Sequence, residues 1–231
     1  MRERTLAIIP ARGGSKRIQK KNIHPFRGRP LLAWTVEAAL AAGCFSRVVV
    51  STDDEEIARV AREWGAEVPF LRQLAADDHA PASAATLAAV DQCEEHWGET
   101  WDTAVQLFAV CPLRTAEHIR DAMAAFRASD AAFLLSAYRF HWTNPWWACT
   151  LDGNGVPTRL FPDAYIRSQD LPTLYSPSGA IWIAELPALR EAGTFYGPGH
   201  IYWPMDWKAA VDIDTVEDLE IADTLFPQVP R

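Results

Sequence analysis

Short apolar runs alternate with amphipathic segments over most of this chain. Residues 5–10 and 47–51 are apolar and end at turn-forming residues, which predicts two buried strands. Between them, apolar positions at helical spacing predict a helix over 30–42, with Pro30 in its first turn and Gly43 after its end. The same patterns predict further strands over 68–71, 103–110, 131–137, 180–184 and 201–204, and further helices over 53–64, 83–97, 116–128 and 218–226. Strands that alternate with helices predict an α/β fold with a doubly wound, mostly parallel sheet.

This alternation stops between about residue 138 and residue 177. The segment contains Trp142, Trp146 and Trp147, several prolines and an Asp-Gly-Asn-Gly stretch at 152–155 that favours a tight turn. A break of this kind is typical of an inserted hairpin or arm. We therefore predict one domain over residues 1–231 with an arm inserted at about 138–177.

Composition and charge restrict the class of protein. The chain has 231 residues, 49% of them hydrophobic, and a net charge of −8. Nucleic-acid-binding surfaces are usually basic, so this balance argues against a nucleic-acid partner. No apolar run reaches the roughly 18 residues of a membrane helix, and the first residues lack the apolar core of a signal peptide. We therefore expect a cytoplasmic protein without a membrane partner.

Against this acidic background, basic residues are concentrated just after the first predicted strand. The segment runs Pro-Ala-Arg-Gly-Gly-Ser-Lys-Arg from residue 10 and continues with Lys21 and Asn22. Glycines such as Gly13 and Gly14 let backbone N–H groups approach an anion closely, and arginine and lysine neutralise phosphate charge. The spacing matches neither G-x-x-x-x-G-K-[ST] nor G-x-G-x-x-G. Its position at the carboxyl end of a first parallel strand favours a phosphate site over a solvated basic turn.

Two carboxylates mark the other end of the chain. Asp212 and Asp214 stand two positions apart on an extended segment, so their side chains point to the same side. Such a pair can hold Mg²⁺ beside a triphosphate. The alternative is that Asp214 or Thr215 caps the helix that follows. The phosphate loop at the start of the chain favours the metal.

Four segments in chain order are similar to those of a known family: PARGGSK with KN at 10–16 and 21–22, STD at 51–53, PLRT at 112–115 and DIDT at 212–215. Together they resemble the acylneuraminate cytidylyltransferase family over essentially the whole chain. The segment RSQDL at 167–171 resembles the pseudaminic acid branch, whereas SGAIWI at 178–183 is closer to the sialic and legionaminic acid branches. The sequence thus combines features of three branches.

The resemblance implies a Rossmann-like sheet of the nucleotide-diphospho-sugar transferase type and a defined reaction. A nine-carbon 2-keto sugar acid attacks the α-phosphate of CTP through the hydroxyl on its anomeric carbon, and pyrophosphate leaves. Arg12 and Lys21 would stabilise phosphate charge, and Asp212 and Asp214 would bind Mg²⁺, so these four are the implied catalytic residues. The implied nucleotide-binding residues are Ala11, Arg12, Gly13, Gly14, Ser15, Lys16, Asn22 and Ser83, the last in place of a serine-rich stretch near the base.

Three further residues are implied for the sugar acid, namely Phe108, Arg167 and Gln169. The sialic acid branch has a glutamine where Phe108 stands, so we expect a less polar sugar pocket, as in the pseudaminic acid branch. In the family an arm crosses between subunits, and its arginine meets the sugar carboxylate. The resemblance therefore implies a homodimer in which Arg167 acts across the interface. The alternative is that the arm tryptophans pack locally and Arg167 is a surface residue.

Three other functions fit parts of this pattern. A KDO cytidylyltransferase would run the same reaction on an eight-carbon acid, and a GT-A glycosyltransferase also binds a metal through a D-x-D pair. A non-catalytic nucleotide-binding homologue would retain the fold alone. The acidic pair near the end of the chain and the basic loop at its start argue against the glycosyltransferase. A pure binder needs no metal pair.

Overall fold

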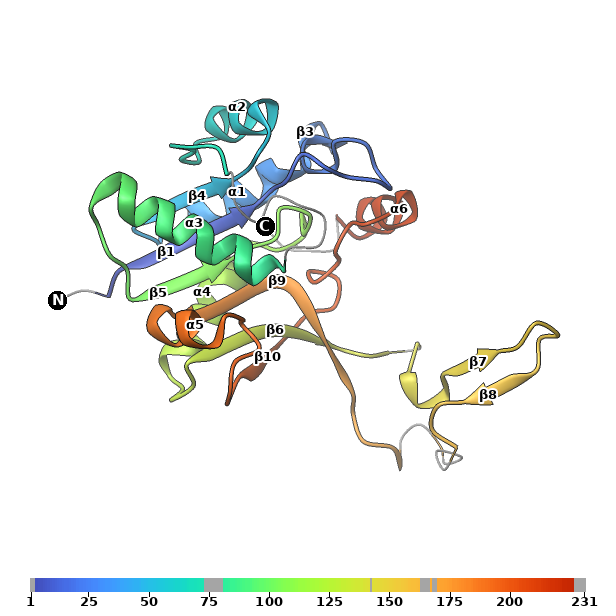
Figure 1. Cartoon of the computed structure of the whole chain (residues 1–231). Coiled ribbons are helices and arrows are strands. Elements are labelled where there is room, and N and C mark those ends of the chain that lie inside the picture. The colour runs from blue at the N-terminus through green and yellow to red at the C-terminus, as the bar shows by residue number, and fades with distance from the viewer. Residues whose placement is uncertain (1–2, 73–80, 142, 163–166, 168–169, 227–231) are drawn as a thin grey trace.

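A six-stranded sheet carries helices on both faces and an arm that projects from one side (Figure 1). The computed structural model describes residues 3–72, 81–141, 143–162, 167 and 170–226. The strands lie in the order β10-β6-β9-β5-β1-β4 across the sheet. Their bounds are β1 Thr5–Pro10, β4 Arg47–Ser51, β5 Thr103–Gln106, β6 Phe133–Arg139, β9 Tyr175–Glu185 and β10 Ile201–Met205.

The sheet is mixed but mostly parallel. β1 lies between β4 and β5 and pairs with both in parallel, and β6 pairs in parallel with β10. β9 is antiparallel to both of its neighbours, β5 and β6. The strand predicted at 180–184 is therefore longer than expected and runs against the others. In the described residues of the arm no α-helix forms a crossover between β6 and β9, and a parallel neighbour would need such a crossover.

Helices cover both faces because strands such as β1 are apolar on both sides. They span Leu31–Ala42 (α1), Glu55–Glu63 (α2), Ala82–Trp97 (α3), Ala116–Arg127 (α4), Leu186–Ala192 (α5) and Val216–Leu225 (α6). In β1, Ala7 and Ile9 join the core with α1, α2, α4 and α6, whereas Leu6 and Ile8 join the core with α3 and α5. Alternate residues of a strand point to opposite faces, so a fully apolar strand is stable only between two helical layers. Among the described residues, none of these helices is long and apolar enough to cross a bilayer.

Two predicted strands differ from the structure. The strand predicted over 103–110 ends at Gln106, because the chain then bends away to form one wall of a pocket. The strand predicted over 68–71 does not form in this described stretch, and only Glu67, just before it, bridges to β4. Pro69 has no N–H to donate to a ladder, which explains why the apolar run does not continue the sheet.

The basic loop leads into a short 3-10 helix and a small hairpin. These elements are η1 (Lys21–Ile23), β2 (Pro25–Phe26) and β3 (Arg29–Pro30). Arg27 and Gly28 form the turn at positive φ, 51° and 78°, as a two-residue hairpin loop requires. Arg27 also forms an ion pair with Asp223 of α6, so the hairpin ties the N-terminal loop to the last helix. Strands of two residues show no periodicity, and the sequence pattern did not predict them.

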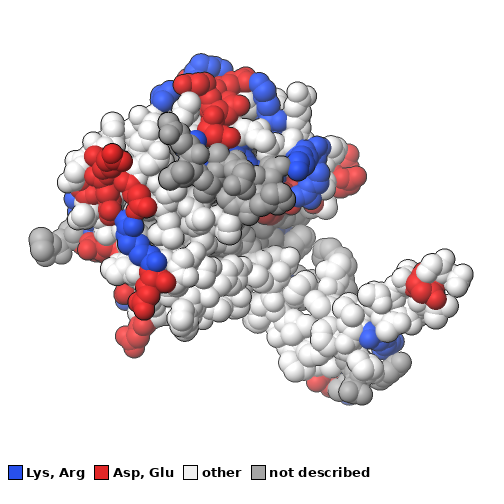
Figure 2. All heavy atoms as spheres, in the orientation of Figure 1, with Lys and Arg blue, Asp and Glu red and all other residues white. Residues whose placement is uncertain are grey.

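The arm leaves the sheet after β6 and returns as β9 (Figure 1). It contains η2 (Pro145–Trp147) and a two-stranded sheet of β7 (Cys149–Leu151) and β8 (Pro157–Arg159). The tight turn lies at 152–155, where Asp152 Oδ1 accepts hydrogen bonds from two backbone N–H groups at 2.8 Å. Trp142 lies outside the described residues. Few charged side chains lie on the arm, whereas many lie over α2 and the neighbouring loop (Figure 2).

Candidate active site

The basic loop follows β1 and rests on the connection between β4 and α2. The Ala11 N–H donates to the Ser51 carbonyl oxygen at 2.9 Å, and the Gly13 N–H donates to Asp53 Oδ1 at 2.8 Å. A side chain at Gly13 would press against Asp54, whose carboxylate caps α2 by accepting from two backbone N–H groups. Gly13 therefore permits two loops to pack closely, and its N–H is bound by the protein itself.

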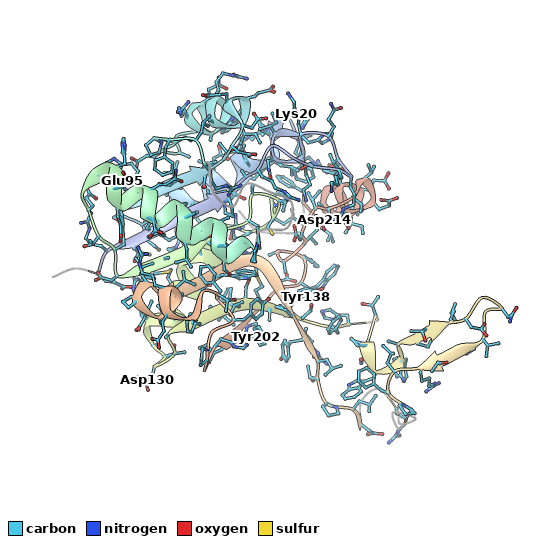
Figure 3. All side chains as sticks on the ribbon, viewed as in Figure 1. Lys20, Glu95, Asp130, Tyr138, Tyr202 and Asp214 are labelled. Carbon is cyan, nitrogen blue, oxygen red and sulfur yellow. The ribbon has the colours of Figure 1, made fainter. Side chains whose placement is uncertain are left out.

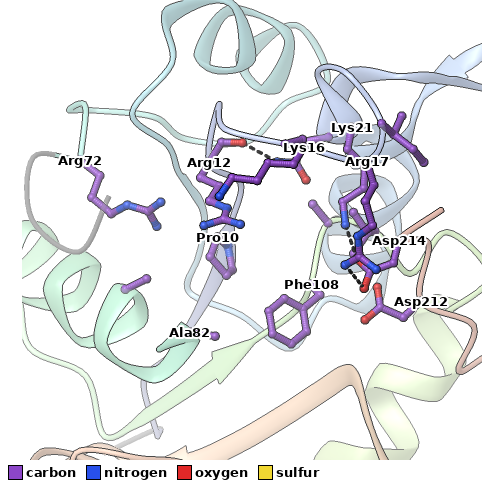
Figure 4. A pocket seen from close by; sticks show the side chains of 16 residues that line it. Pro10, Arg12, Lys16, Arg17, Lys21, Arg72, Ala82, Phe108, Asp212 and Asp214 are labelled. Atoms are coloured by element: carbon purple, nitrogen blue, oxygen red, sulfur yellow. Dashed lines mark hydrogen bonds and ion pairs between the residues drawn. The ribbon is translucent and has the colours of Figure 1, made fainter. Parts of the chain in front are cut away.

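A pocket of about 460 Å³ opens beside this loop (Figure 4). Its volume is that of a small-molecule site, and it lies beyond the carboxyl ends of β1 and β5, where sheets of this type bind ligands. The lining residues are Pro10, Arg12, Ser15, Lys16, Arg17, Ile18, Lys21, Asn22, Arg72, Ala82, Ala85, Phe108, Ala109, Val110, Asp212 and Asp214. The predicted nucleotide-binding residues that are not among them are Ala11, Gly13, Gly14 and Ser83.

One side of the pocket is cationic (Figure 4). Arg12 and Lys16 extend toward its interior. Arg17 and Lys21 extend toward the acidic pair. The loop that carries them is braced from within, because Asn22 is buried and its Nδ2 donates to the Arg12 carbonyl oxygen at 2.8 Å. Four positive charges held around one space suit a polyanionic ligand.

The acidic pair lies against this loop, although the two segments come from opposite ends of the chain (Figure 3). Lys21 Nζ donates to Asp214 Oδ1 at 2.6 Å, and Arg17 Nη2 donates to Asp214 Oδ2 at 2.7 Å. Helix α6 is capped by Thr215, whose hydroxyl accepts from the Asp218 N–H. Thr215 therefore takes the capping role, and the Asp214 carboxylate faces the pocket.

The two carboxylates of the pair differ in acidity. Partial burial by the pocket walls, and then the charge of Asp214, raise the pKa of Asp212 to about 6. Asp212 remains accessible from the opening of the pocket. Burial acts in the same direction on Asp214, but the bonds from Lys21 and Arg17 outweigh it and hold the pKa of Asp214 below its usual value. At neutral pH both carboxylates are therefore charged.

This donor set fits a metal ion whose coordination is completed by a substrate. Among the described residues, no group of three or more His, Cys, Asp or Glu side chains could hold a metal by itself. Mg²⁺ commonly uses one or two carboxylates and takes its other ligands from water and substrate phosphates. The Asp212 and Asp214 carboxylates, beside an open and cation-lined pocket, meet that requirement.

Arg72 is a pocket residue that the sequence motifs did not reveal. Its side chain points into the pocket and is 4% exposed (Figure 4). Its Nε and Nη1 have no hydrogen-bond partner among the described residues, although buried polar groups are normally paired. Burial lowers the pKa of this group, and an acceptor-rich ligand would supply the missing partners. A single arginine after an apolar run carries no local pattern, so only the fold identifies it.

Ser83 does not face the pocket, and this geometry does not support its predicted contact with the base. The residue is 4% exposed, and its hydroxyl accepts from the Phe195 N–H at 3.3 Å. Ala82 and Ala85 form that wall of the pocket instead, since positions three apart share a helix face. The phase of α3 thus turns the serine toward the core.

Of the predicted sugar-binding residues that the structure describes, only Phe108 lies at the pocket. Phe108 lines the pocket opposite Arg12 (Figure 4). Arg167 lies on the arm, where its side chain is 75% exposed and its Nε donates to Asp170 Oδ2 at 2.9 Å. Gln169 lies outside the described residues. Within a single chain, therefore, Arg167 does not contribute to the pocket.

Comparisons with known sequences show which family the chain is similar to. A family model described as cytidylyltransferase matches residues 6–145, more than half of the chain. The chain is 35% identical over 226 residues to a pseudaminic acid cytidylyltransferase of Campylobacter jejuni subsp. jejuni serotype O:23/36 (strain 81-176), covering 96% of each protein. It is 33% identical over 230 residues to a CMP-N,N'-diacetyllegionaminic acid synthase of Legionella pneumophila subsp. pneumophila, again covering 96% of each.

A solved structure shows the same fold. CMP:2-keto-3-deoxy-manno-octonic acid synthetase complexed with CTP matches with a TM-score of 0.74, over 98% of this chain and 99% of that one, at 15% identity. An identity this low supports the fold alone. The family match, with two relatives above 30% identity over nearly their whole length, shows that the chain belongs to the cytidylyltransferase family.

Proposed function

We propose that this cytidylyltransferase joins CMP from CTP to a nonulosonic acid, a nine-carbon 2-keto sugar acid, and releases pyrophosphate. The observation that carries the proposal is a single pocket in which a basic loop from the start of the chain meets a carboxylate pair from its end. Relatives named for pseudaminic and legionaminic acid support the sugar class. Membership of the cytidylyltransferase family argues against the glycosyltransferase alternative.

In this proposal the triphosphate of CTP lies along the cationic side of the pocket. Arg12 and Lys16 hold phosphate oxygens, and Lys21 stabilises the charge that develops on the α-phosphate. Asp212 and Asp214 would hold Mg²⁺, which would supply the Lewis acidity that neutralises phosphate charge. Transfer of this kind requires mainly positioning and charge stabilisation, so no further protein nucleophile is needed.

The sugar acid binds at the Phe108 side of the pocket, which is apolar. An aromatic wall favours the pseudaminic acid branch, in which an aromatic residue stands at this position. Pyrophosphate release with CTP and each of pseudaminic, legionaminic and sialic acid tests this assignment, with KDO as the eight-carbon control. Turnover with KDO that exceeds turnover with every nine-carbon acid would contradict the proposed substrate class.

CTP is expected to be preferred over UTP, ATP and GTP. The preference follows from the family, and it is measured as pyrophosphate release with each nucleotide at fixed sugar acid. Equal rates with UTP would show that the pocket does not select cytosine. The general assignment as a nucleotidyltransferase would survive that result.

Replacing Arg72 with methionine is expected to raise the KM for CTP. A hydrogen bond to a charged group contributes about 1.5–3 kcal/mol, which corresponds to a change of roughly 10- to 100-fold. The matched control is Arg190→Met, which removes an arginine that pairs with Asp91 and Glu94 away from the pocket. Equal KM values for CTP in the two variants would exclude a nucleotide contact by Arg72.

We further propose that the protein is a homodimer joined through the arm. Large apolar side chains are exposed on this segment, namely Trp147, Leu151, Val156, Leu160, Phe161 and Tyr175. Exposed apolar side chains that are concentrated on one segment are typical of protein interaction sites, and few charged side chains lie on the arm to oppose association (Figure 2). A dimer would bring the exposed Arg167 of one chain to the pocket of its partner, where a guanidinium can bind a sugar carboxylate bidentately.

A further inference from the structure

β9 is irregular where it passes the pocket. Beyond the end of β5, the Phe108 N–H donates to the Gly179 carbonyl oxygen at 3.3 Å, one residue out of the regular register. On the other side, the register with β6 shifts between Leu135 and Ala137. These two residues pair with Trp182 and Pro177, so an advance of two residues along β6 corresponds to five residues along β9. We refer to residues 178–181 of β9 as the bulge. Bulges of this kind occur next to active sites, where they redirect side chains.

On the β6 side, a buried serine takes the place of ladder hydrogen bonds. Ser136 Oγ accepts from the Ile181 N–H at 2.9 Å and lies 2.8 Å from Ser178 Oγ. The Trp182 Nε1 donates to the Ser178 carbonyl oxygen at 2.7 Å. Buried backbone groups need partners, and in a bulge the neighbouring strand cannot provide them all. Ser136, which is wholly buried, supplies one of the missing partners.

On the β5 side, Arg114 has the same role. Its Nη1 donates to the Ala180 carbonyl oxygen at 2.6 Å and to the Phe108 carbonyl oxygen at 3.3 Å. The side chain is wholly buried, and its Nε and Nη2 have no partner among the described residues. Burial lowers the pKa of Arg114 to about 10, which leaves the guanidinium charged at neutral pH. The Asp212 carboxylate acts on this guanidinium only at longer range, and among the described residues no ion pair with Arg114 forms. Burial of a charge that is not directly paired opposes folding, so stability alone does not account for an arginine here.

The bulge determines where the ring of Phe108 lies. A Cβ on Gly179 would overlap this ring, so the ring rests directly on the Gly179 backbone. The edge of the ring packs against Trp182, with 5.3 Å between centroids and 78° between planes. The Phe108 carbonyl oxygen accepts from Arg114 Nη1 and also from Thr35 Oγ1 at 3.2 Å, whereas its N–H depends on the bulge alone. Both the backbone and the ring of Phe108 therefore depend on the bulge.

We propose that Arg114 and Ser136 are positioning residues for the sugar acid: they hold the bulge, and the bulge holds Phe108 as the wall against which the sugar packs. This inference rests on the proposed function, in which the sugar acid binds at Phe108. Neither residue lines the pocket. A loosened bulge changes the sugar side of the pocket and leaves the cationic loop intact. It therefore weakens binding of the sugar acid and leaves binding of CTP unchanged.

The test compares Ser136→Ala and Arg114→Lys with the unaltered protein. We expect the KM for the sugar acid to rise about tenfold or more, the KM for CTP to change less than about twofold, and the relative kcat/KM among the nonulosonic acids to change. Ser136→Ala removes only one oxygen, so it provides the readout if Arg114→Lys does not fold. Ser136 Oγ donates to the Ser178 carbonyl oxygen at 3.3 Å. The matched control is Ser46→Ala, since Ser46 Oγ likewise donates to a carbonyl oxygen, that of Thr5 at 2.8 Å, and accepts from an indole N–H away from the pocket.

A purely structural role makes a different prediction. In that case Ser136→Ala and Ser46→Ala would lower Tm and the fraction of active protein, with both KM values and the selectivity unchanged, and the inference would be wrong. Equal increases in both KM values would also overturn it. Phe108→Leu separates the inference from the proposed function. If Phe108→Leu changes the KM for the sugar acid and Ser136→Ala does not, only the inference fails. If Phe108→Leu has no effect, the sugar acid does not pack there, and both the inference and that part of the proposed function fail.

Discussion

Replacing Asp214 with alanine is expected to lower turnover about 10²-fold or more, since it removes a group that stabilises charge in the transition state. In the proposed function Asp214 has two roles in the pocket. It is one of the two carboxylates that fit Mg²⁺, and it accepts hydrogen bonds from Lys21 at 2.6 Å and Arg17 at 2.7 Å. Its loss would leave the triphosphate poorly neutralised and Lys21 without its fixed partner.

Asp214→Asn separates these two functions, because an amide oxygen still accepts a hydrogen bond but binds Mg²⁺ more weakly. We expect this variant to require a higher Mg²⁺ concentration for half-maximal pyrophosphate release. The matched control is Asp223→Asn, which alters a carboxylate of α6 that pairs with Arg27 outside the pocket. If Asp214→Asn is impaired but has the Mg²⁺ dependence of the control, Asp214 positions Lys21 and does not bind the metal.

Mixing the variants Arg167→Ala and Lys21→Ala is expected to restore part of the activity that each lacks alone. Without Arg167 the sugar acid should bind about 1.5–3 kcal/mol more weakly. The assay is therefore run at a sugar acid concentration at which this variant is nearly inactive. In a heterodimer with a shared site, one of the two pockets has Lys21 from its own chain and Arg167 from the partner. With random exchange at equal amounts, about a quarter of all sites are then intact.

Subunit exchange is the control for this experiment, and it is verified by the mass of differently tagged dimers. A mixture of Lys21→Ala with the unaltered protein gives the reference activity, because every site in that mixture has an intact Arg167. If heterodimers are present and the mixture remains as inactive as the separate variants, the arm does not complete the partner's pocket. Arg167 would then be the surface residue that the alternative interpretation describes. A monomer at all concentrations would exclude the dimer itself.

The bounds of several strands, the cationic loop and the family could all be predicted from local features of the sequence. β1 and β4 lie at the predicted bounds, Thr5–Pro10 and Arg47–Ser51, because short runs that are apolar on both faces are stable only between two helical layers. The cations of the loop after β1 were also visible in the sequence, since their charges stand next to one another in the chain. The sequence motifs were sufficient to predict the family, and the family match confirms that prediction.

The direction of β9 and the rest of the pocket were decided only by the tertiary structure. Arg72 is a pocket residue because the fold buries its side chain against the pocket, with Nε and Nη1 unpaired among the described residues. Ser83 is not, because the phase of α3 turns it toward Phe195. The bulge depends on Ser136 and Arg114, which reach it from other segments of the chain. Periodicity records which face of an element is apolar, but it does not record which distant side chain satisfies a given buried backbone group. That assignment exists only once the segments have packed together.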